Sequence, residues 1–221
     1  MYGQMHITSI TSLTRTPDRL TVKVNGKAVA SLSVKLVAEL GLKIDQVWDS
    51  ETRRRVEQAA RYDKAMRAAM SRLNRRAMSS FQLNRKLREL GHDQDSCRQV
   101  MDRLDELGLV NDEMVGKAII RSASRRQAAG PRLLKQKLVQ KGLDARLIDE
   151  LVDQSTDRTS QIEQAADLAR RRLAGMKHLD PLTIRRRLYN LLMRRGFEPG
   201  VVESVMQELK QQSADPADED I

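Results

Sequence analysis

The sequence predicts a mainly α-helical protein in which three three-helix repeats follow one another in tandem, preceded by a small N-terminal β-hairpin or sheet cap. Three observations support this prediction. Ser80, Pro131 and Pro181 open equivalent segments and stand 51 and 50 residues apart. Apolar residues within each segment recur at helical spacing, and glycines mark the helix ends. The first fifty residues instead alternate apolar and polar side chains, as strands do.

Five positions of the repeat recur in every copy. A fixed period near 50 residues indicates one supersecondary unit stacked in tandem, and such arrays usually present an extended binding surface rather than a pocket. In chain order these positions are Leu83, Leu87, Gly91, Val100 and Met101; Leu134, Leu138, Gly142, Leu151 and Val152; and Ile184, Leu188, Gly196, Val205 and Met206.

Residues 1–48 are predicted to form the β cap. Three runs that are rich in β-branched or alternating residues predict strands over 7–13, 20–24 and 27–32. Asn25-Gly26 stands between the last two runs and is the strongest short-range hairpin signal. A short helix over residues 33–40 ends at Gly41. Because a lone hairpin is marginal in water, we expect the cap to pack on this helix or on the first repeat.

The rest of the chain is helical to about residue 212, and the predicted repeat limits are 49–110, 111–156 and 157–212. In the first repeat, Asp49 or Ser50 caps a helix that runs to about Asn74. Gly91 and Gly108 end the next two helices. Three short amphipathic helices therefore make up one repeat.

The second repeat begins with a helix that Asn111-Asp112 caps, and Gly130-Pro131 opens its second helix. Gly116 should weaken the start of the first helix by up to about 1 kcal/mol relative to Ala. We expect the apolar face of that first helix to carry Val115, Ala118, Ile119 and Ser122.

In the third repeat, Asp180-Pro181 opens a second helix that reaches Gly196 only after four extra residues. Four residues are close to one helical turn, so we expect a longer helix that keeps the same buried face. Residues 213–221 hold four acidic residues and no basic one, which predicts an acidic, disordered tail.

The charge of the remaining chain is strongly positive. Residues 1–212 carry 40 basic and 26 acidic residues, a net charge of +14. A folded body this basic favours a polyanionic partner through counterion release. The alternative is a helical surface that is kept soluble by its charge. With one Trp, three Tyr and two Phe, the chain lacks the aromatic side chains on which single-strand readers stack bases.

No enzymatic, metal or cofactor signature is present in the sequence. His6, His92 and His178 are far apart and lack metal-ligand spacing. There is no glycine-rich phosphate loop and no dinucleotide fingerprint. The one cysteine, Cys97, sits at an apolar helix position and reads as a small core residue. We therefore expect a non-enzyme without cofactors, and the absence of disulfide, leader and membrane-spanning patterns predicts a cytoplasmic protein.

Basic clusters recur with the repeat, just before and along each second helix, and fall between the apolar positions. Arg dominates them, and its planar fork binds phosphate and carboxylate in bidentate fashion, which solubility alone does not require. The wider clusters include Lys86, Lys137, Arg170, Arg172 and Arg187. The predicted partner- or DNA-binding residues are Arg72, Arg75, Arg76, Arg85, Arg88, Arg121, Arg125, Arg126, Arg132, Lys135, Lys141, Arg171, Arg185, Arg186, Arg194 and Arg195.

Three local patterns resemble the RecX family of bacterial RecA regulators. The first runs from Arg75-Arg76 through Ser79, Leu83 and Leu87 to Gly91, and the second is Leu107–Asp112. The third, the most recognisable, is Gly130–Leu134 followed by Lys137–Leu143. The likeness covers about residues 50–212, and the N-terminal hairpin resembles an extension found in some members. Departures are Asn111 where an acid is common, the missing aromatic after Asp112, and the four-residue insertion in the third repeat.

The resemblance implies a protein that binds in the groove of the RecA–DNA filament across successive protomers. It implies inhibition of the filament's ATPase and of strand exchange, promotion of filament disassembly, and a place in homologous recombination, DNA repair and the SOS response. The implied partners are the RecA filament and single- or double-stranded DNA, bound directly or through the filament. We expect a monomer that contacts no membrane. The alternative is an independent basic helical-repeat protein that binds DNA or RNA.

Overall fold

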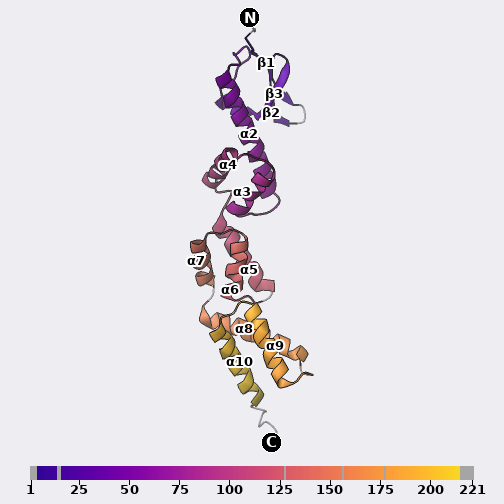
Figure 1. Ribbon diagram of the computed structural model, residues 1–221, viewed down its shortest axis with the longest axis vertical. Coiled ribbons are helices and arrows are strands. Elements are labelled where there is room, and N and C mark those ends of the chain that lie inside the picture. The colour runs from indigo at the N-terminus through magenta and orange to yellow at the C-terminus, as the bar shows by residue number, and fades with distance from the viewer. Residues whose placement is uncertain (1–3, 14–15, 127, 156, 177, 215–221) are drawn as a thin grey trace. The chain divides into compact units, whose positions relative to one another are not determined.

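The structure, a computed structural model, describes residues 4–13, 16–126, 128–155, 157–176 and 178–214 (Figure 1). The chain forms two compact units: Met1–Met78 with Gln82–Val110, and Ser79–Phe81 with Asn111–Ile221. The predicted fold class is confirmed, because the described chain is mainly helical, contains three three-helix groups and begins with a three-stranded antiparallel sheet. The predicted limits of the cap and of the repeats stay predictions.

The sheet of unit 1 consists of strands β1 (Ile7–Leu13), β2 (Thr16–Val24) and β3 (Lys27–Ser33), paired in the order β1-β2-β3. The β2–β3 hairpin turns at Asn25 and Gly26, whose φ angles of 47° and 79° suit the left-handed turn that Asn-Gly favours. Ile7, Val22 and Leu32 come from one strand each and are fully buried. The alternation in the sequence therefore does produce a sheet with one buried face.

That buried face packs on helix α1 (Val34–Glu39) and on the first half of helix α2 (Ser50–Leu73). Val37 of α1 and Val56 of α2 lie in the same apolar cluster as the sheet residues, together with Trp48. Asp49 is the N-cap of α2, and its Oδ1 accepts a hydrogen bond from the Thr52 N–H at 2.7 Å. The cap therefore packs on both elements that the sequence offered as alternatives.

A buried ion pair ties the sheet to α2. Arg19 of β2 donates from Nη1 to Asp63 Oδ2 at 2.7 Å, and both side chains are 9% exposed. Arg19 also donates from Nη2 to the Ser31 carbonyl at 2.6 Å, and Arg67 donates from Nε to Asp63 Oδ2 at 3.3 Å. The charges are thus paired and hydrogen-bonded on several sides, which a buried pair needs in order to offset its desolvation.

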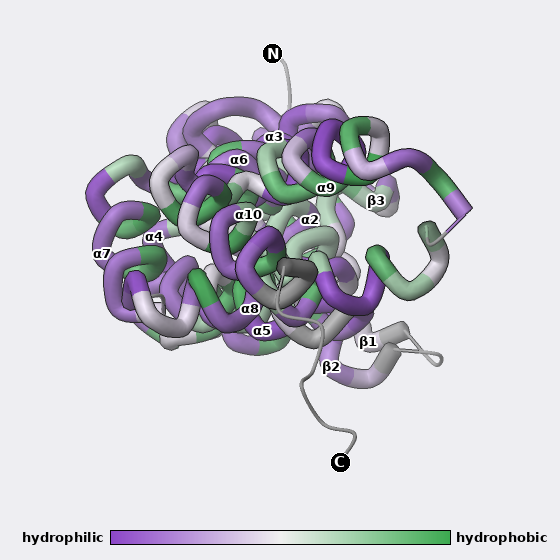
Figure 2. The backbone as a smooth tube through the Cα atoms, turned by 90° about the horizontal axis from the view of Figure 1, so that it is seen from below, coloured by the Kyte–Doolittle hydropathy of each residue, from purple (hydrophilic) through white to green (hydrophobic). Residues whose placement is uncertain are grey.

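The second half of α2 packs with helices α3 (Ser80–Glu89) and α4 (Gln94–Glu106) around a second apolar cluster. Leu83 and Leu87 of α3 meet Val100 and Leu104 of α4 there, and all four are fully buried. Cys97 is 1% exposed in this cluster, which matches its predicted role as a small core residue. Hydrophobic and hydrophilic residues alternate along the turns of the helices (Figure 2).

In unit 2, helices α5 (Asp112–Arg126), α6 (Pro131–Gln140) and α7 (Ala145–Ser155) enclose the next apolar cluster. The predicted face of α5 is partly wrong, since Ala118 and Ser122 are exposed while Gly116 and Ile120 are buried. The reason is that Gly116 has no side chain. A Cβ there would lie 2.4 Å from Leu151 Cδ1, so the glycine lets α7 approach α5 closely.

The last group consists of helices α8 (Arg158–Leu173), α9 (Pro181–Arg194) and α10 (Pro199–Ala214), with a short 3₁₀ turn, η1 (Ala174–Met176), after α8. Helix α9 has 14 residues and its counterparts α3 and α6 have 10 each, which confirms that the insertion lengthens this helix. Helix α10 continues to Ala214, two residues into the predicted tail. Residues 215–221 of that tail lie outside the described residues.

Backbone contacts within unit 2 join the start of α6 to the turn after α9. The Gly130 N–H donates to the Arg195 carbonyl at 2.9 Å, and the Arg132 N–H donates to the Gly196 carbonyl at 3.1 Å. A Cβ on Gly130 would lie 2.4 Å from the Gly196 oxygen, so glycine is required for this approach. At the start of α3, the Ser80 N–H donates instead to a side chain, Asp112 Oδ1 at the start of α5, at 2.8 Å.

Candidate partner-binding surface

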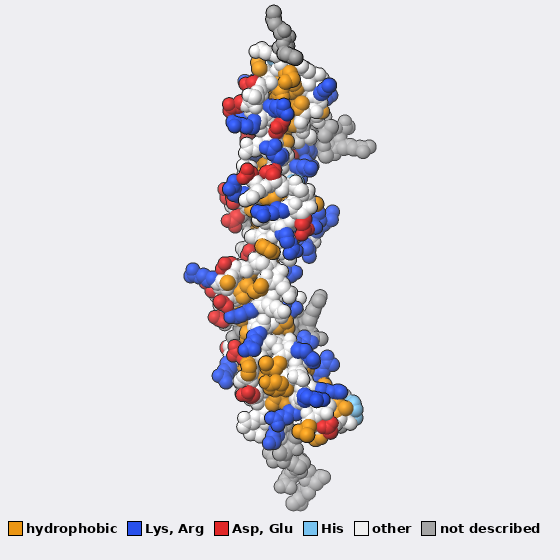
Figure 3. All heavy atoms as spheres, in the orientation of Figure 1, with side chains coloured by type: hydrophobic (Ala, Val, Ile, Leu, Met, Phe, Trp, Pro, Cys, Tyr) orange, Lys and Arg blue, Asp and Glu red, His pale blue; other side chains and the backbone are white. Residues whose placement is uncertain are grey.

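The predicted binding residues occupy the second helix of each group and the segments around it. Figure 3 shows Lys and Arg side chains on the visible face of each unit, mixed with acidic and hydrophobic ones. In the first group, these residues lie at the end of α2, in the α2–α3 loop and on α3: Arg72, Arg75, Arg76, Arg85 and Arg88. In the other two groups they lie on α5, on and directly after α6, on α8, and on and directly after α9: Arg121, Arg132, Lys135, Lys141, Arg171, Arg185, Arg186, Arg194 and Arg195. The side chains of Arg125 and Arg126 lie outside the described part of the structure.

Two of these cations form ion pairs with carboxylates of the chain itself. Arg85 lies 3.5 Å from Glu89 one turn along α3. Lys135 of α6 donates to Asp149 Oδ1 of α7 at 2.6 Å, and this hydrogen bond raises the pKa of the Lys135 ammonium. An anion of the partner must displace these internal carboxylates, so each of the two residues should contribute less binding energy than the sequence suggested.

Most of the other predicted cations are exposed and have no ion-pair partner in the part of the chain that the structure describes. Within the described residues, no carboxylate oxygen lies within 4 Å of the guanidinium groups of Arg75, Arg76, Arg88, Arg121, Arg132, Arg185, Arg186, Arg194 and Arg195. All but Arg195 are exposed, and Arg195 is half-buried. An exposed, unpaired guanidinium can bind phosphate or carboxylate in bidentate fashion without first breaking an internal contact.

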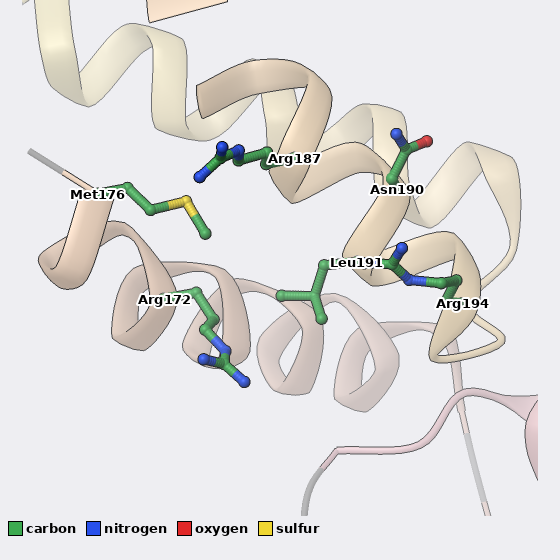
Figure 4. A pocket seen from close by; sticks show the side chains of 6 residues that line it. All are labelled: Arg172, Met176, Arg187, Asn190, Leu191 and Arg194. Carbon is green, nitrogen blue, oxygen red and sulfur yellow. The ribbon is translucent and has the colours of Figure 1, made fainter. Parts of the chain in front are cut away.

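Three arginines line a cavity of about 320 Å³ between α8 and α9 (Figure 4). Arg172 comes from the end of α8, and Arg187 and Arg194 come from α9, two turns apart. From the sequence, Arg172 and Arg187 were placed in the wider basic clusters but were not predicted as binding residues. Their position around one cavity depends on how α8 packs against the lengthened α9, and periodicity within one helix does not encode that packing.

The cavity combines these charges with an apolar lining. Leu191 of α9 and Met176 of η1 are half-buried, and Asn190 adds an amide at the rim. Figure 4 shows the arginine side chains around Leu191 and Met176. This lining suits an anionic ligand that also carries apolar atoms, because each kind of group finds a matching surface.

His6, His92 and Cys97 are neither cavity-lining nor predicted binding residues. His6 Nδ1 is 3.0 Å from the Asp45 carbonyl, and burial lowers the pKa of His92, with the Lys64 charge as a smaller cause. Burial also raises the pKa of the Cys97 thiol, which makes it a poor nucleophile. No group of His, Cys, Asp and Glu in the described residues could hold a metal ion. Among the helices described, none combines the length and the apolar content that crossing a membrane requires.

Comparison with known proteins reveals matches to three family models along the helical part of the chain. They are described as the first, second and third three-helix domains of RecX and match residues 65–104, 111–152 and 159–206. The third of these ranges contains the arginine-lined cavity. The three matches follow the three helix groups in order.

Relatives and solved structures agree with these matches. A regulatory protein RecX of Amycolatopsis mediterranei is 32% identical over 151 residues, which cover 67% of this chain and 84% of that protein. A regulatory protein RecX of Clostridioides difficile is 27% identical over 203 residues, 92% of this chain and 95% of that protein. A crystal structure of a regulatory protein RecX has a similar fold, with a TM-score of 0.79 at 20% identity over 92% of this chain and 99% of that one. The chain therefore belongs to the RecX family of regulatory proteins.

Proposed function

We propose that this protein inhibits the RecA recombinase by binding in the groove of the RecA–DNA filament. Bound there, it slows the filament's ATP hydrolysis and strand exchange and promotes disassembly of the filament. The proposal is carried by exposed arginines that recur on α3, α6 and α9 and form no ion pair within the described residues, in a chain of the RecX family. The protein acts as a cytoplasmic monomer and is not an enzyme.

The proposed mechanism is bridging. Each three-helix group carries its own basic positions, so one chain offers several anion-binding sites in a fixed order. A polymer with repeating, negatively charged sites can bind more than one three-helix group at once. After the first group has bound, the second binds at a high effective concentration. A chain that bridges neighbouring RecA protomers resists the rearrangement between subunits that ATP turnover requires.

The experiment that tests this proposal is a titration of RecA ATPase on single-stranded DNA. The expected result is inhibition at well below one chain per RecA, because one bridging chain affects several protomers. Hydrolysis that continues unchanged at equimolar protein contradicts the proposal.

The second candidate is a helical-repeat protein that binds DNA or RNA without RecA. The net charge of +14 on residues 1–212 favours it, since counterion release alone gives sequence-independent affinity. The same preparation can be titrated against a fluorescein-labelled single-stranded oligonucleotide at physiological salt. Tight binding to the bare oligonucleotide with unchanged RecA ATPase selects this candidate over the RecA inhibitor.

A further inference from the structure

We propose that the cavity lined by Arg172, Arg187 and Arg194 is a binding site for a carboxylate-rich peptide segment, and that the chain's own residues 215–221 occupy it. The segment then competes with a polyanionic partner for the basic surface of α8 and α9. The binding of residues 215–221 in the cavity is argued from the cavity and the segment alone. Only the competition with a polyanionic partner rests on the proposed function.

The charge of the cavity calls for an anion. Within the described residues, none of its three guanidinium groups lies within 4 Å of a carboxylate oxygen, whereas the adjacent Arg170 pairs with both Asp167 and Glu208. Three like charges around one cavity repel one another and raise the local positive potential. A bound carboxylate relieves this repulsion.

The chemistry of residues 215–221 matches the lining. The segment reads Asp215-Pro216-Ala217-Asp218-Glu219-Asp220-Ile221, with four acidic residues and no basic one. Its carboxylates can pair with the arginines in bidentate fashion, and its aliphatic side chains suit the surface of Leu191 and Met176. A nucleic-acid backbone supplies phosphates but no aliphatic side chains, so the apolar lining favours the peptide.

Helix α10, which precedes residues 215–221, ends near the part of the third helix group that contains the cavity. The Cβ position of Gly200 lies 3.7 Å from Arg158 at the start of α8, and Glu208 pairs with Arg170 near its end. Helices α10 and α8 therefore run in the same direction. Six more residues carry α10 about 9 Å further, to Ala214. Helix α10 thus ends on the side where Arg172 and Met176 line the cavity.

The length of the segment suffices to reach the cavity. Seven extended residues span up to about 24 Å, which exceeds the distance of about 10 Å between the axes of packed helices. Exposed carboxylate–arginine pairs are individually weak, so the contact depends on salt. Tethering to α10 offsets this weakness, because the local concentration of the segment reaches the millimolar range.

Paramagnetic labelling of the full chain tests the occupancy without DNA or RecA. A nitroxide is attached to the Ala217→Cys variant; Cys97, 1% exposed, stays unlabelled. We expect broadening of the amide signals of Arg187, Asn190 and Arg194, which 1 M NaCl reverses. The R172Q/R187Q/R194Q variant should lose this broadening. The control R171Q/R185Q/R186Q removes the same charge from the same two helices and should keep it.

Equal broadening in the two triple variants, or broadening confined to the end of α10, would contradict the binding of residues 215–221 in the cavity.

The competition with a polyanionic partner is tested separately, by measuring the affinity of the protein for fluorescein-labelled dT30. Ending the chain after Ala214 should raise this affinity about threefold in the parent, the size of one weak surface ion pair, and distinctly less in R172Q/R187Q/R194Q. An equal rise in both backgrounds, or no binding of dT30, overturns the competition only. RecA inhibition, measured separately, decides the proposed function.

Discussion

Arg19 and Arg53 each lie 2.7 Å from an acidic partner, but their surroundings differ. Arg19 and Asp63 are buried between the sheet and α2, whereas the Arg53–Glu57 pair stands one turn apart on the exposed face of α2. A buried charge that loses its partner retains its desolvation cost, while an exposed charge returns to water. At the residue scale, stability therefore depends on where an ion pair lies more than on how many pairs exist.

Replacing Arg19 by Met should lower the free energy of unfolding by about 3 kcal/mol, because Asp63 stays buried and loses its buried partner, while the Arg67 that it keeps is largely exposed. Urea unfolding followed by circular dichroism measures the change. The Arg53→Met variant is the matched control and should unfold at the parent's urea midpoint. Equal shifts of the midpoint in the two variants would show that burial of the Arg19 pair is not decisive.

Replacing Gly116 by Ala tests why a helix-weakening residue stands in α5. Helix propensity alone predicts a gain of up to about 1 kcal/mol. The structure predicts a net loss of about 1 kcal/mol, because the new Cβ would lie 2.4 Å from Leu151 Cδ1 and 3.0 Å from Leu143 Cδ2. The loss should shrink when Leu151 is replaced by Val. Gly200→Ala on α10 meets only the Arg158 side chain, at 3.7 Å, and should not destabilise the protein.

At the scale of helices and strands, local signals in the sequence predict the beginnings of elements well. Asp49 and Asp180, which were predicted at helix starts, each accept the N–H three residues on, and Asp93 and Asp157 do the same. These short-range hydrogen bonds depend on residue type and spacing, which the sequence contains. The buried face of α5 depends instead on how closely α7 approaches, and its prediction was partly wrong for that reason.

The capping aspartates also predict how stability depends on pH. Hydrogen bonds from Ser96, Ser160 and Thr183 lower the pKa of Asp93, Asp157 and Asp180 in the folded chain. The stabilisation is therefore complete above the ordinary Asp pKa and is lost as the pH falls through the lowered values. Melting temperatures between pH 6 and pH 2 should drop less steeply in D93N/D157N/D180N, since Asn caps without titrating.

The control for this series is Asp102→Asn on the exposed side of α4, where Asp102 caps no helix. Its melting temperature should follow the parent at every pH. A triple variant that loses stability as steeply as the parent would exclude the caps as the source of the acid sensitivity.

At the scale of the whole molecule, the repeat period predicted the three helix groups, and the alternating first fifty residues predicted the sheet. The candidate surface was predictable only in part. Arg132, Arg185 and Arg186 are exposed, and they form no ion pair within the described residues, but Lys135 is bound to Asp149. The cavity of Arg172, Arg187 and Arg194 joins residues from two helices. Contacts between helices depend on packing, so spacing along one helix does not reveal them.

The central claim is that unpaired arginines on the second helices carry the binding of the partner. The most direct measurement compares inhibition of RecA ATPase by two variants of equal net charge. R132Q/R185Q/R186Q removes unpaired arginines of α6 and α9, and R53Q/R98Q/R146Q removes arginines paired within their own helices. We predict that the first variant needs at least about tenfold more protein for half-inhibition, as expected when several charge contacts of weak individual energy are lost, while the second inhibits like the parent. Equal inhibition by both folded variants would contradict the account.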